Sequence, residues 1–386
     1  MSITASSFAS PTKPASWSWE ATSESVAERY GIPVEQVVRF DQNTAPSPPD
    51  LVREILAAGV FEVPLSEYPP SDYGRLVSAA AERYGVGRDE LLVGAGADEI
   101  LDLCAKAFVP AGGAAVVPVP TYPMYGILTD QRRAAVVRVP RRGAAAEYAL
   151  DIDAVRVAVA EPADNGALPG VVWLCSPNNP TGRAEPDGVI AALLEGLARD
   201  ADAAGRPHPT VVLDEAYTEF TGGTLAGLRA TYPRLVVLRT MSKAYSIAGL
   251  RVGFAVARPE VIEEIAVYRP PGSVSNVSVD VAAALLSDAG LAPSRVAAIA
   301  AERERFGKAL RDAGWDPQPS TTNFLLVAFA STAAAEAAAE GLLSRGLIPR
   351  TFPADHPLAH CLRLTVRNAD QDDRLVSAAR EIGAGA

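Results

Sequence analysis

The chain has 386 residues, of which 48% are hydrophobic and 21% charged, and its formal net charge is −11. This length suits two domains rather than one ordinary core, and the composition is that of a folded globular protein. The negative charge argues against nucleic acid as a partner, because such binding depends on clustered lysines and arginines, and no apolar run approaches the roughly 20 residues that span a bilayer.

The cysteines give no sign of a metal site or a disulfide framework. Cys104, Cys175 and Cys361 are an odd number, lie far apart and sit among apolar residues, which is typical of buried thiols. Only three histidines occur, so a lysine is a better candidate than a histidine for a catalytic base. The first 18 residues lack a basic segment followed by an apolar stretch, and we therefore expect a cytoplasmic protein.

The hydrophobic pattern predicts alternating strands and helices after a polar arm over residues 1–45. Helical periodicity begins at Asp50 and returns over Gly74–Tyr84 and Asp98–Phe108. Short β-branched runs then predict strands at Ala115–Val119, Ala135–Val139, Val171–Cys175, Thr210–Leu213, Leu235–Leu238 and Val252–Val256. Strands that alternate with helices indicate parallel β-α-β units, and hence a large α/β domain, which we place at residues 46–270.

The pattern changes after Pro270-Pro271-Gly272. Two long Ala-rich helices are predicted over Ser294–Ala313 and Thr332–Arg345, with a strand at Phe324–Ala328 between them. A further strand at Cys361–Val366 and a last helix near Asp370–Ile382 follow. This mixture predicts a smaller α+β domain over residues 271–386.

A glycine-rich loop, Val93-Gly94-Ala95-Gly96-Ala97-Asp98-Glu99, lies between a strand and a predicted helix. The amides of Ala97 and Asp98 at the start of that helix can bind phosphate, since helix N-termini offer unpaired N–H groups and a favourable dipole. The string also imitates the Gly-x-Gly-x-x-Gly loop of dinucleotide-binding proteins. Glu99 stands at its third glycine position, however, which disfavours that interpretation.

Three further motifs each follow directly after an apolar predicted strand. The string Ser176-Pro177-Asn178-Asn179-Pro180-Thr181-Gly182 is by itself an ordinary loop, and Asp214-Glu215-Ala216-Tyr217 fits a structural cap as well as a ligand site. Lys243, in Arg239-Thr240-Met241-Ser242-Lys243, can act as an amine nucleophile near an anion site, although a lone loop lysine is usually just solvated. Their coincidence is therefore more informative than any one motif.

Together, these motifs resemble those of the fold-type I aminotransferases, which use pyridoxal 5'-phosphate (PLP). In that family Asn-Pro-Thr-Gly, Asp-x-Ala-Tyr and Ser-Lys follow one another, and an arginine comes eight residues after the lysine. Here 35 residues separate Asn179 from Asp214, 26 separate Tyr217 from Lys243, and Arg251 stands eight residues beyond Lys243. The resemblance implies an α/β protein of fold type I, with a large, mostly parallel αβα domain and a smaller α+β domain.

The resemblance also assigns roles around the cofactor. Lys243 holds PLP as a Schiff base and, once released, serves as the base that moves the Cα proton of the substrate. Asp214 pairs with the ring nitrogen and keeps it protonated, so that the ring can act as an electron sink. Asn179 and Tyr217 hydrogen-bond the phenolic oxygen. By the same resemblance, the ring of Tyr122 stacks on the cofactor ring. The cofactor phosphate is bound by Thr240, Ser242 and Arg251.

Several positions narrow the resemblance to the histidinol-phosphate aminotransferase-like branch. Arg350 and Arg363 lie 13 residues apart, as in that branch, and imply a substrate with a carboxylate or phosphate, since guanidinium groups bind such anions bidentately. Asn43 stands at the position of the branch's substrate-loop asparagine. Tyr68 stands where a tyrosine reaches the phosphate of the neighbouring subunit, which implies a homodimer with shared sites.

The chain departs from this branch around the substrate. Asn-Glu-Asn-Pro is replaced by Asn43-Thr44-Ala45-Pro46, Arg269 is an unusual arginine in its loop, and Arg367-Asn368 stand where a Gly-Thr pair is common. The substrate therefore stays open within the class of amino acids and amines that carry an anionic group. A specialised biosynthetic role would suit these changes.

The leading hypothesis is transfer of an amino group between such a small-molecule substrate and a 2-oxo acid. A PLP-dependent decarboxylase or β-eliminating lyase is the alternative, because the same branch contains threonine-phosphate decarboxylases and the bond that is cleaved depends on geometry. A non-catalytic PLP-fold binding protein is the third hypothesis. It predicts loss of Lys243 or Asp214, and both are present.

Overall fold

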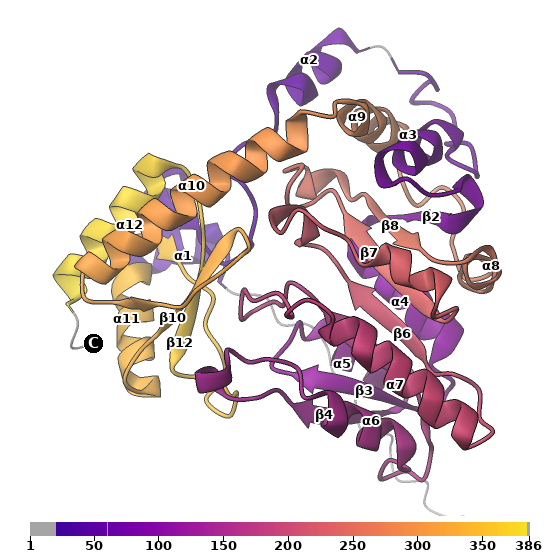
Figure 1. Cartoon of the computed structure of the whole chain (residues 1–386). Helices are drawn as coiled ribbons and strands as arrows, with labels where there is room; N and C mark the ends of the chain where they lie inside the picture. The colour runs from indigo at the N-terminus through magenta and orange to yellow at the C-terminus, as the bar shows by residue number, and fades with distance from the viewer. Residues whose placement is uncertain (1–20, 60, 384–386) are drawn as a thin grey trace, which may run out of the picture.

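The computed structural model describes residues 21–59 and 61–383. A seven-stranded sheet with helices on both faces forms the larger part, and a three-stranded sheet with its own helices forms the smaller part (Figure 1). This arrangement confirms the predicted fold class. Residues 1–20 of the predicted arm lie outside the described residues.

The large sheet has the strand order β2-β8-β7-β6-β5-β3-β4. Its strands are β2 (Leu91–Gly94), β3 (Ala114–Val119), β4 (Ala135–Pro140), β5 (Pro169–Cys175), β6 (Thr210–Asp214), β7 (Leu235–Thr240) and β8 (Gly253–Val256). All neighbours are parallel except β8, which runs antiparallel to both β2 and β7. The sequence predicts the position of β8 but not this direction. The connection between β7 and β8 contains the short 3-10 turn η6 and no α-helix, whereas a parallel crossover usually contains a helix.

The strands of this sheet alternate their side chains between two cores. Val211 and Leu213 of β6 belong to the cluster covered by α3 (Gly74–Tyr84), α6 (Ile152–Ala160), α7 (Val189–Ala203) and α9 (Asn276–Ser287). Val212 belongs to the opposite cluster, covered by α4 (Gly96–Phe108), α5 (Met124–Gln131) and α8 (Pro259–Ala266). Because both faces are covered, the central strands are almost entirely apolar.

The small sheet has the antiparallel order β12-β10-β9. Its elements and the helices packed beside it are α10 (Leu291–Asp312), β9 (Asp316–Pro317), β10 (Phe324–Ala328), α11 (Thr332–Leu343), β12 (Cys361–Thr365) and α12 (Ala369–Ile382). The described part of the arm joins this region, because β1 (Val38–Arg39) pairs in parallel with β11 (Leu347–Ile348). In addition, Tyr30 at the end of α1 (Ser23–Tyr30) donates a hydrogen bond of 2.7 Å to Glu340.

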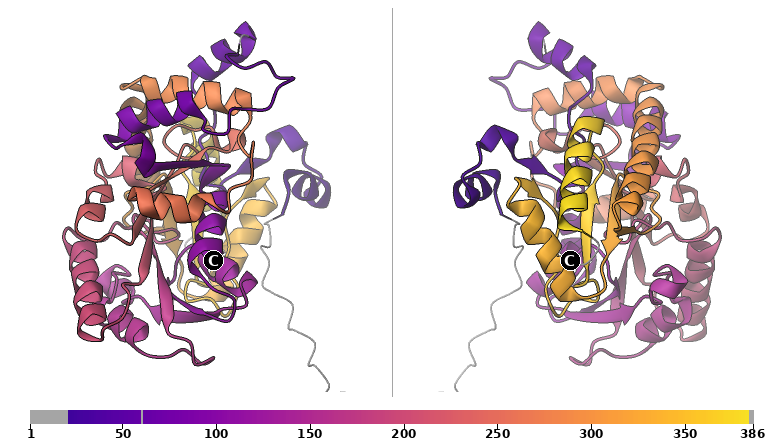
Figure 2. Two further views of the ribbon diagram at one scale, coloured as in Figure 1. Left: turned by 90° about the vertical axis from the view of Figure 1, so that its right-hand side faces the viewer. Right: turned by 90° about the vertical axis from the view of Figure 1, so that its left-hand side faces the viewer.

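The remaining described elements are one helix and several short 3-10 turns. The helix α2 (Asp50–Ala58) projects from the body of the molecule (Figures 1 and 2). Short 3-10 turns lie at η1 (Val34–Gln36), η2 (Arg88–Glu90), η3 (Ala144–Ala146), η4 (Thr218–Phe220), η5 (Ala226–Ala230) and η6 (Ala248–Leu250). The helix α9 follows the predicted boundary at residue 270, yet its buried side chains belong to a core of the large sheet. The domain boundaries themselves stay predictions.

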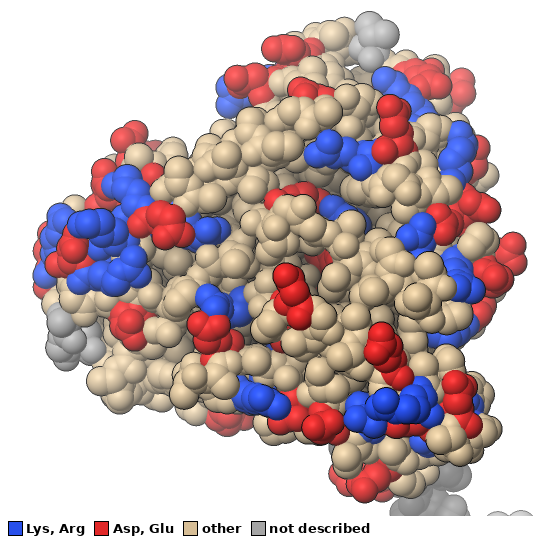
Figure 3. Space-filling model, in the orientation of Figure 1, with Lys and Arg blue, Asp and Glu red and all other residues tan. Residues whose placement is uncertain are grey.

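Acidic and basic side chains are interspersed around the rim of the face seen in Figure 3. Among the helices that the structure describes, none is by itself long and apolar enough to cross a membrane. Only together do the helices α9 and α10 have the length and apolar composition of a membrane span, and the chain bends by 81° at the break between them.

Candidate active site

The motifs predicted from the sequence meet at one edge of the large sheet. β2, β3, β5, β6 and β7 run in one direction, so their carboxyl ends share that edge, where open α/β sheets bind ligands. The loops after these strands begin at Ala95, Pro120, Ser176, Glu215 and Met241. Each of these loops carries a predicted site residue, so the fold collects them from distant parts of the chain.

Asp214 is the buried carboxylate of the site, at the end of β6. One of its oxygens accepts a hydrogen bond of 2.8 Å from the hydroxyl of Tyr125, and the other accepts one of 2.9 Å from the amide of Ala216. Burial raises the pKa of the Asp214 carboxyl, although these two donors lower it. Both donors are neutral, so a cationic partner at this position would stabilise the carboxylate.

Lys243 lies in the loop after β7, and its amine is half-buried. Its Nζ is 3.3 Å from the backbone oxygen of Gln42 and 5.7 Å from the centre of the Tyr217 ring. Burial, and next the positive charge of Arg363, lower the pKa of the Lys243 amine to about 8. A lysine with this pKa is partly neutral near physiological pH, as a nucleophile requires.

This shift predicts the pH dependence of Lys243 in protein from which the cofactor has been removed. The amine should react with an amine-labelling reagent with a midpoint near pH 8, because it is protonated and unreactive below that pH and neutral above it. The rate at Lys243 is measured by mass spectrometry of its peptide. A short lysine peptide is the control and should react with a midpoint near the usual value of about 10.4. The same high midpoint at Lys243 would contradict the prediction.

The predicted phosphate end of the site is built where α4 approaches β8. Arg251, which follows the turn η6, donates a hydrogen bond of 3.1 Å to the carboxylate of Asp98. Gly96 has a φ of +83°, and a Cβ there would lie 2.5 Å from the Arg251 guanidinium. A Cβ on Gly253 would lie 2.7 Å from the amide nitrogen of Ala97. Both glycines are therefore needed for the close approach of α4, β8 and Arg251.

Hydroxyl and amide donors complete this end. The Thr240 hydroxyl donates to the Ser242 hydroxyl at 3.0 Å and accepts from the Ser242 amide at 3.2 Å. Ala97 and Asp98 stand in the first turn of α4, where backbone N–H groups have no acceptor within the helix. These are the donors that an anion prefers at a helix N-terminus.

Tyr122 has contacts that the sequence did not predict. Its hydroxyl donates a hydrogen bond of 3.0 Å to Asp98, and its ring meets the ring of Tyr125 edge-on, with centroids 5.7 Å apart. Asp98 therefore joins Tyr122 to Arg251 through its side chain. The stacking of Tyr122 on a cofactor stays a prediction.

A second group of predicted residues is gathered around Arg363 and Tyr217. The Arg363 guanidinium of β12 donates to the Asn179 side chain at 2.6 Å and to the backbone oxygen of Asp41. Its Nε is buried and has no hydrogen-bond partner among the described residues. Burial lowers the pKa of Arg363 to about 10. Asn43 donates from its side chain to the Tyr217 hydroxyl at 2.9 Å, which links the arm to the loop after β6.

The last two predicted residues, Arg350 and Tyr68, lie in different surroundings. Arg350 is the backbone partner of Arg363, with two N–H···O bonds of 3.0 Å between them, and its charge lowers the pKa of Arg363. Tyr68 stands apart, because its side chain is 94% exposed and lies beside Gly272 in the loop before α9.

Sequence reasoning missed three residues that hold this site together. Tyr125 binds Asp214, the hydroxyl of Thr365 accepts a bond of 2.8 Å from the Asn43 amide, and Asn323 donates to the Asn43 backbone oxygen at 2.9 Å. Tyr125 stands in the same motif as Tyr122, three residues later. This spacing of about one helical turn was the signal in the sequence that could have indicated Tyr125 as a site residue. The links of Asn43 to Thr365 and Asn323 span about 300 residues and leave no local pattern in the sequence.

The constellation fits PLP, which has a phosphate at one end and a protonable nitrogen in its ring. Donors around Arg251 suit the phosphate, the buried Asp214 needs the positive charge that a protonated ring nitrogen offers, and Lys243 provides the amine. When bound, PLP supplies a carbonyl group for the exchange of amines and an electron sink. The fold and these groups define a PLP-dependent enzyme of fold type I.

Comparison with known proteins assigns the family. Residues 37–378 match the family model for aminotransferases of class I and II, and the chain belongs to this family. It is 36% identical to a histidinol-phosphate aminotransferase of Roseiflexus castenholzii over 93% of both chains. The crystal structure of histidinol-phosphate aminotransferase from Sinorhizobium meliloti in complex with PLP has a TM-score of 0.83 and 25% identity, covering 99% of both chains.

These findings confirm the prediction of a PLP-dependent aminotransferase that resembles the histidinol-phosphate branch. An L-threonine-O-3-phosphate decarboxylase from Porphyromonas gingivalis also has this fold, with a TM-score of 0.68 over 89% of this chain and 99% of that chain. Its identity of 23% shows the fold alone. As an aminotransferase, the enzyme uses an amino substrate and a 2-oxo acid.

Proposed function

We propose that the enzyme transfers the amino group of an amino acid or amine that carries a carboxylate or phosphate. The observation that carries this proposal is Arg363: among the described residues, its buried guanidinium donates hydrogen bonds only to neutral oxygen atoms, and its Nε is unpaired. A buried cation without a hydrogen-bonded anion is costly, and a planar guanidinium binds a carboxylate or phosphate bidentately. An anionic substrate group would supply the negative charge and the hydrogen-bond acceptor that Arg363 lacks.

In this proposal, different residues of the chain have separate roles in the reaction. Lys243 attaches the cofactor and then moves the proton of the substrate Cα, for which its lowered pKa is suited. Asp214 keeps the proton on the ring nitrogen, and Tyr125 holds the Asp214 carboxylate in place. Tyr217, whose hydroxyl accepts a hydrogen bond from Asn43, would donate to the cofactor's phenolic oxygen.

A panel of amino donors tests the substrate class. The purified holoenzyme is mixed with 2-oxoglutarate and with L-histidinol phosphate, L-aspartate, L-alanine or L-histidinol, which lacks the phosphate, and formation of glutamate or of the new oxo product is followed. The names of the relatives make L-histidinol phosphate the first donor to try. Donors with an additional anionic group should react faster than their neutral counterparts. Equal rates for L-histidinol and L-histidinol phosphate would contradict a phosphate-bearing substrate.

Replacing Arg363 with lysine should raise KM for an anionic donor by about 10²-fold, since loss of a buried, bidentate ion pair costs roughly 2–5 kcal/mol. The value of kcat should change less, because the groups around the cofactor remain. Steady-state kinetics with the best donor of the panel measure both constants. Arg345→Ala, which removes an exposed arginine paired with Glu381, is the matched control. An unchanged KM in Arg363→Lys would show that the anion binds elsewhere.

We also propose that the active unit is a two-fold symmetric dimer in which Tyr68 reaches the phosphate site of the partner. The segment that carries Tyr68 exposes apolar side chains that a partner could cover: Leu56 is 47%, Leu65 64% and Tyr68 94% exposed. Exposed apolar groups of this size on one segment are typical of a contact surface.

The structure fixes the loop of Tyr68 firmly despite this exposure. The buried side chain of Asn276 donates to the backbone oxygens of Pro64 and Glu67 at 3.1 and 2.9 Å. Arg269, the unusual arginine of the sequence, donates to the backbone oxygen of Ser71, and its guanidinium lies 5.2 Å from the centre of the Tyr73 ring. A loop held this way can present Tyr68 to a partner without first becoming ordered, which would lower the cost of association.

Tyr68→Phe should weaken PLP binding by roughly 0.5–3 kcal/mol, the range for one hydrogen bond to a neutral or charged group, and leave the attachment to Lys243 intact. PLP affinity is measured by titration of the cofactor-free protein. Mixing Lys243→Ala chains with chains of an inactive Tyr68 variant should restore activity, because a heterodimer has one site with both residues. An active monomer in sedimentation, or no recovery when subunits demonstrably exchange, would contradict the shared site.

The cytoplasmic location stays a prediction from the sequence. Cell fractionation followed by an assay of aminotransferase activity would check it.

A further inference from the structure

A pocket of about 790 Å³ lies at the edge of the large sheet opposite to Lys243. Its walls come from the last residues of α4 and α6, from the second half of α7, and from the amino ends of β5 and β6. Asp214, by contrast, stands at the carboxyl end of β6. A molecule in this pocket would therefore lie apart from the PLP site and would not compete with the amino substrate.

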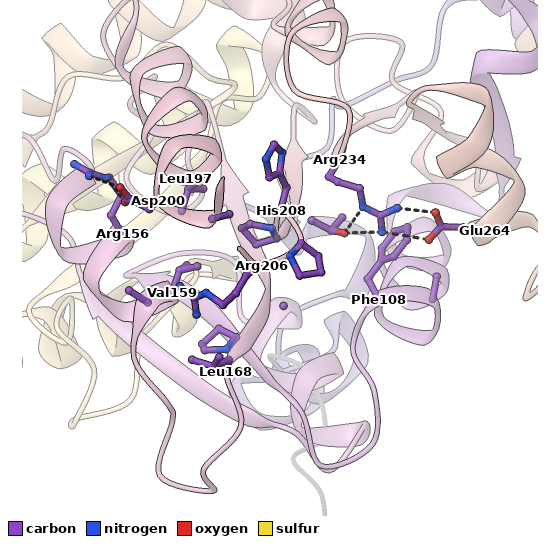
Figure 4. Close-up of a pocket in the computed structure, with 18 residues that line it drawn as sticks. Phe108, Arg156, Val159, Leu168, Leu197, Asp200, Arg206, His208, Arg234 and Glu264 are labelled. Carbon is purple, nitrogen blue, oxygen red and sulfur yellow. Dashed lines mark hydrogen bonds and ion pairs between the residues drawn. The ribbon is translucent and has the colours of Figure 1, made fainter. Parts of the chain in front are cut away.

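Two of the three arginines in this pocket are neutralised by carboxylates of the pocket itself. Arg156 donates to Asp200 through two nitrogens at 2.8 and 2.9 Å. Arg234 donates to Glu264 through two nitrogens at 2.6 and 3.2 Å. Figure 4 shows these two bidentate pairs on opposite sides of the pocket.

The third arginine, Arg206, lies between the two pairs and extends toward Val159 (Figure 4). It is half-buried, and its guanidinium has no hydrogen bond or ion pair with any residue that the structure describes. Its backbone amide is already used, since it donates to the oxygen of Ala201 at 2.9 Å. Arg156 also contacts Asp153 at 3.3 Å, so Arg206 is the arginine of the lining that has no carboxylate partner among the described residues.

The rest of the lining is largely apolar. Phe108, Val159 and Leu197 are buried core residues that close the pocket, and Leu168, which is 43% exposed, forms its rim. The ring of His208, also in the lining, is already engaged: it lies 2.9 Å from Asp202 and stacks on Tyr232 with centroids 5.7 Å apart. Arg206 is therefore the polar group left to orient a ligand. A volume of this size, with apolar walls and few polar groups, is typical of small-molecule sites.

We propose that this pocket binds a small carboxylate with an apolar body, and that Arg206 pairs with the carboxylate. One free guanidinium matches one carboxylate, to which it can donate two hydrogen bonds. A phosphate carries more charge and more acceptor atoms than Arg206 alone can satisfy, and the apolar walls offer it no further donors. The apolar walls would bury the body of the ligand, which supplies most of the binding free energy.

Benzoate is a suitable probe, with benzamide as its neutral analogue and inorganic phosphate as an anion without an apolar body. Calorimetric titration of the PLP-bound enzyme should show benzoate binding, with benzamide and phosphate at least tenfold weaker. Arg206→Ala should weaken benzoate binding at least tenfold and leave transamination unchanged. The matched control is Arg199→Ala, which removes an exposed arginine of α7 that does not line the pocket, and it should bind benzoate like the wild type.

A second variant tests the pocket from its rim. Leu168→Glu would place a carboxylate at the mouth of the pocket, and it should weaken benzoate binding by repulsion and by pairing with Arg206. The proposal is overturned if benzoate does not bind, if it binds Arg206→Ala and wild type equally, or if it acts only as a competitive inhibitor against the amino donor. That last outcome would place benzoate in the PLP site instead.

Discussion

Replacing Lys243 with alanine should lower the rate of amino transfer by a factor on the order of 10⁴, because the variant loses both the amine that attaches the cofactor and the base that moves the Cα proton. The half-buried amine with a pKa of about 8 is the group in the site that can do both. The rate is measured with saturating PLP and the best amino donor. Borohydride should link PLP permanently to the wild-type chain and not to the variant.

Lys308→Ala is the control for this experiment, since Lys308 is exposed and paired with Asp312 on α10. It should keep both the rate and the covalent link. A Lys243→Ala enzyme with near wild-type turnover would refute the assignment of the lysine.

Replacing Asp214 with alanine should lower the rate by on the order of 10² or more, with each tenfold step equal to about 1.4 kcal/mol of barrier. The buried carboxylate is the group that can hold a proton on the ring nitrogen, and an alanine leaves that nitrogen without an anionic partner. Asp214→Asn keeps the size of the side chain and its ability to accept from Tyr125, so it separates loss of charge from loss of packing.

Circular dichroism and bound PLP are measured beside the rates of the Asp214 variants, and Asp312→Asn serves as a control at an exposed carboxylate. Both Asp214 variants should keep the fold and lose the rate. A fast Asp214→Asn enzyme would show that another group protonates the ring.

The cofactor side of the candidate site was largely predictable because most of its residues end a strand or come soon after one. Apolar runs that are buried on both faces stand out in a sequence, and residues just after them come to one edge of a parallel sheet. Asp214 ends β6 in this way, and Lys243 follows β7. Tyr125 was missed because its bond to Asp214 depends on how α5 packs on the sheet, and a local pattern does not contain that orientation.

The substrate side was predictable only through family resemblance. Arg363 lies in the middle of a five-residue buried strand, and a strand pattern predicts apolar packing there rather than a charged site. Its contacts with Asn179 and the Asp41 backbone join three segments far apart in the chain. The antiparallel direction of β8 was likewise not contained in its apolar pattern, because it depends on a connection to β7 that contains no α-helix.

The bond between the amide of Asn43 and the hydroxyl of Thr365 joins residues 322 positions apart, and this separation bears on how the protein is made. A ribosome releases the chain from its amino end, and segments fold as they become able to bury their apolar surface. All seven strands of the large sheet, with the groups that face the cofactor, have emerged once Val256 is released. At that point Asn43 cannot yet form its bond to Thr365, because β12 has not left the ribosome. The proposed cofactor half of the site can thus assemble during synthesis, whereas the proposed substrate half is completed only after β12, which lies much later in the chain than β8.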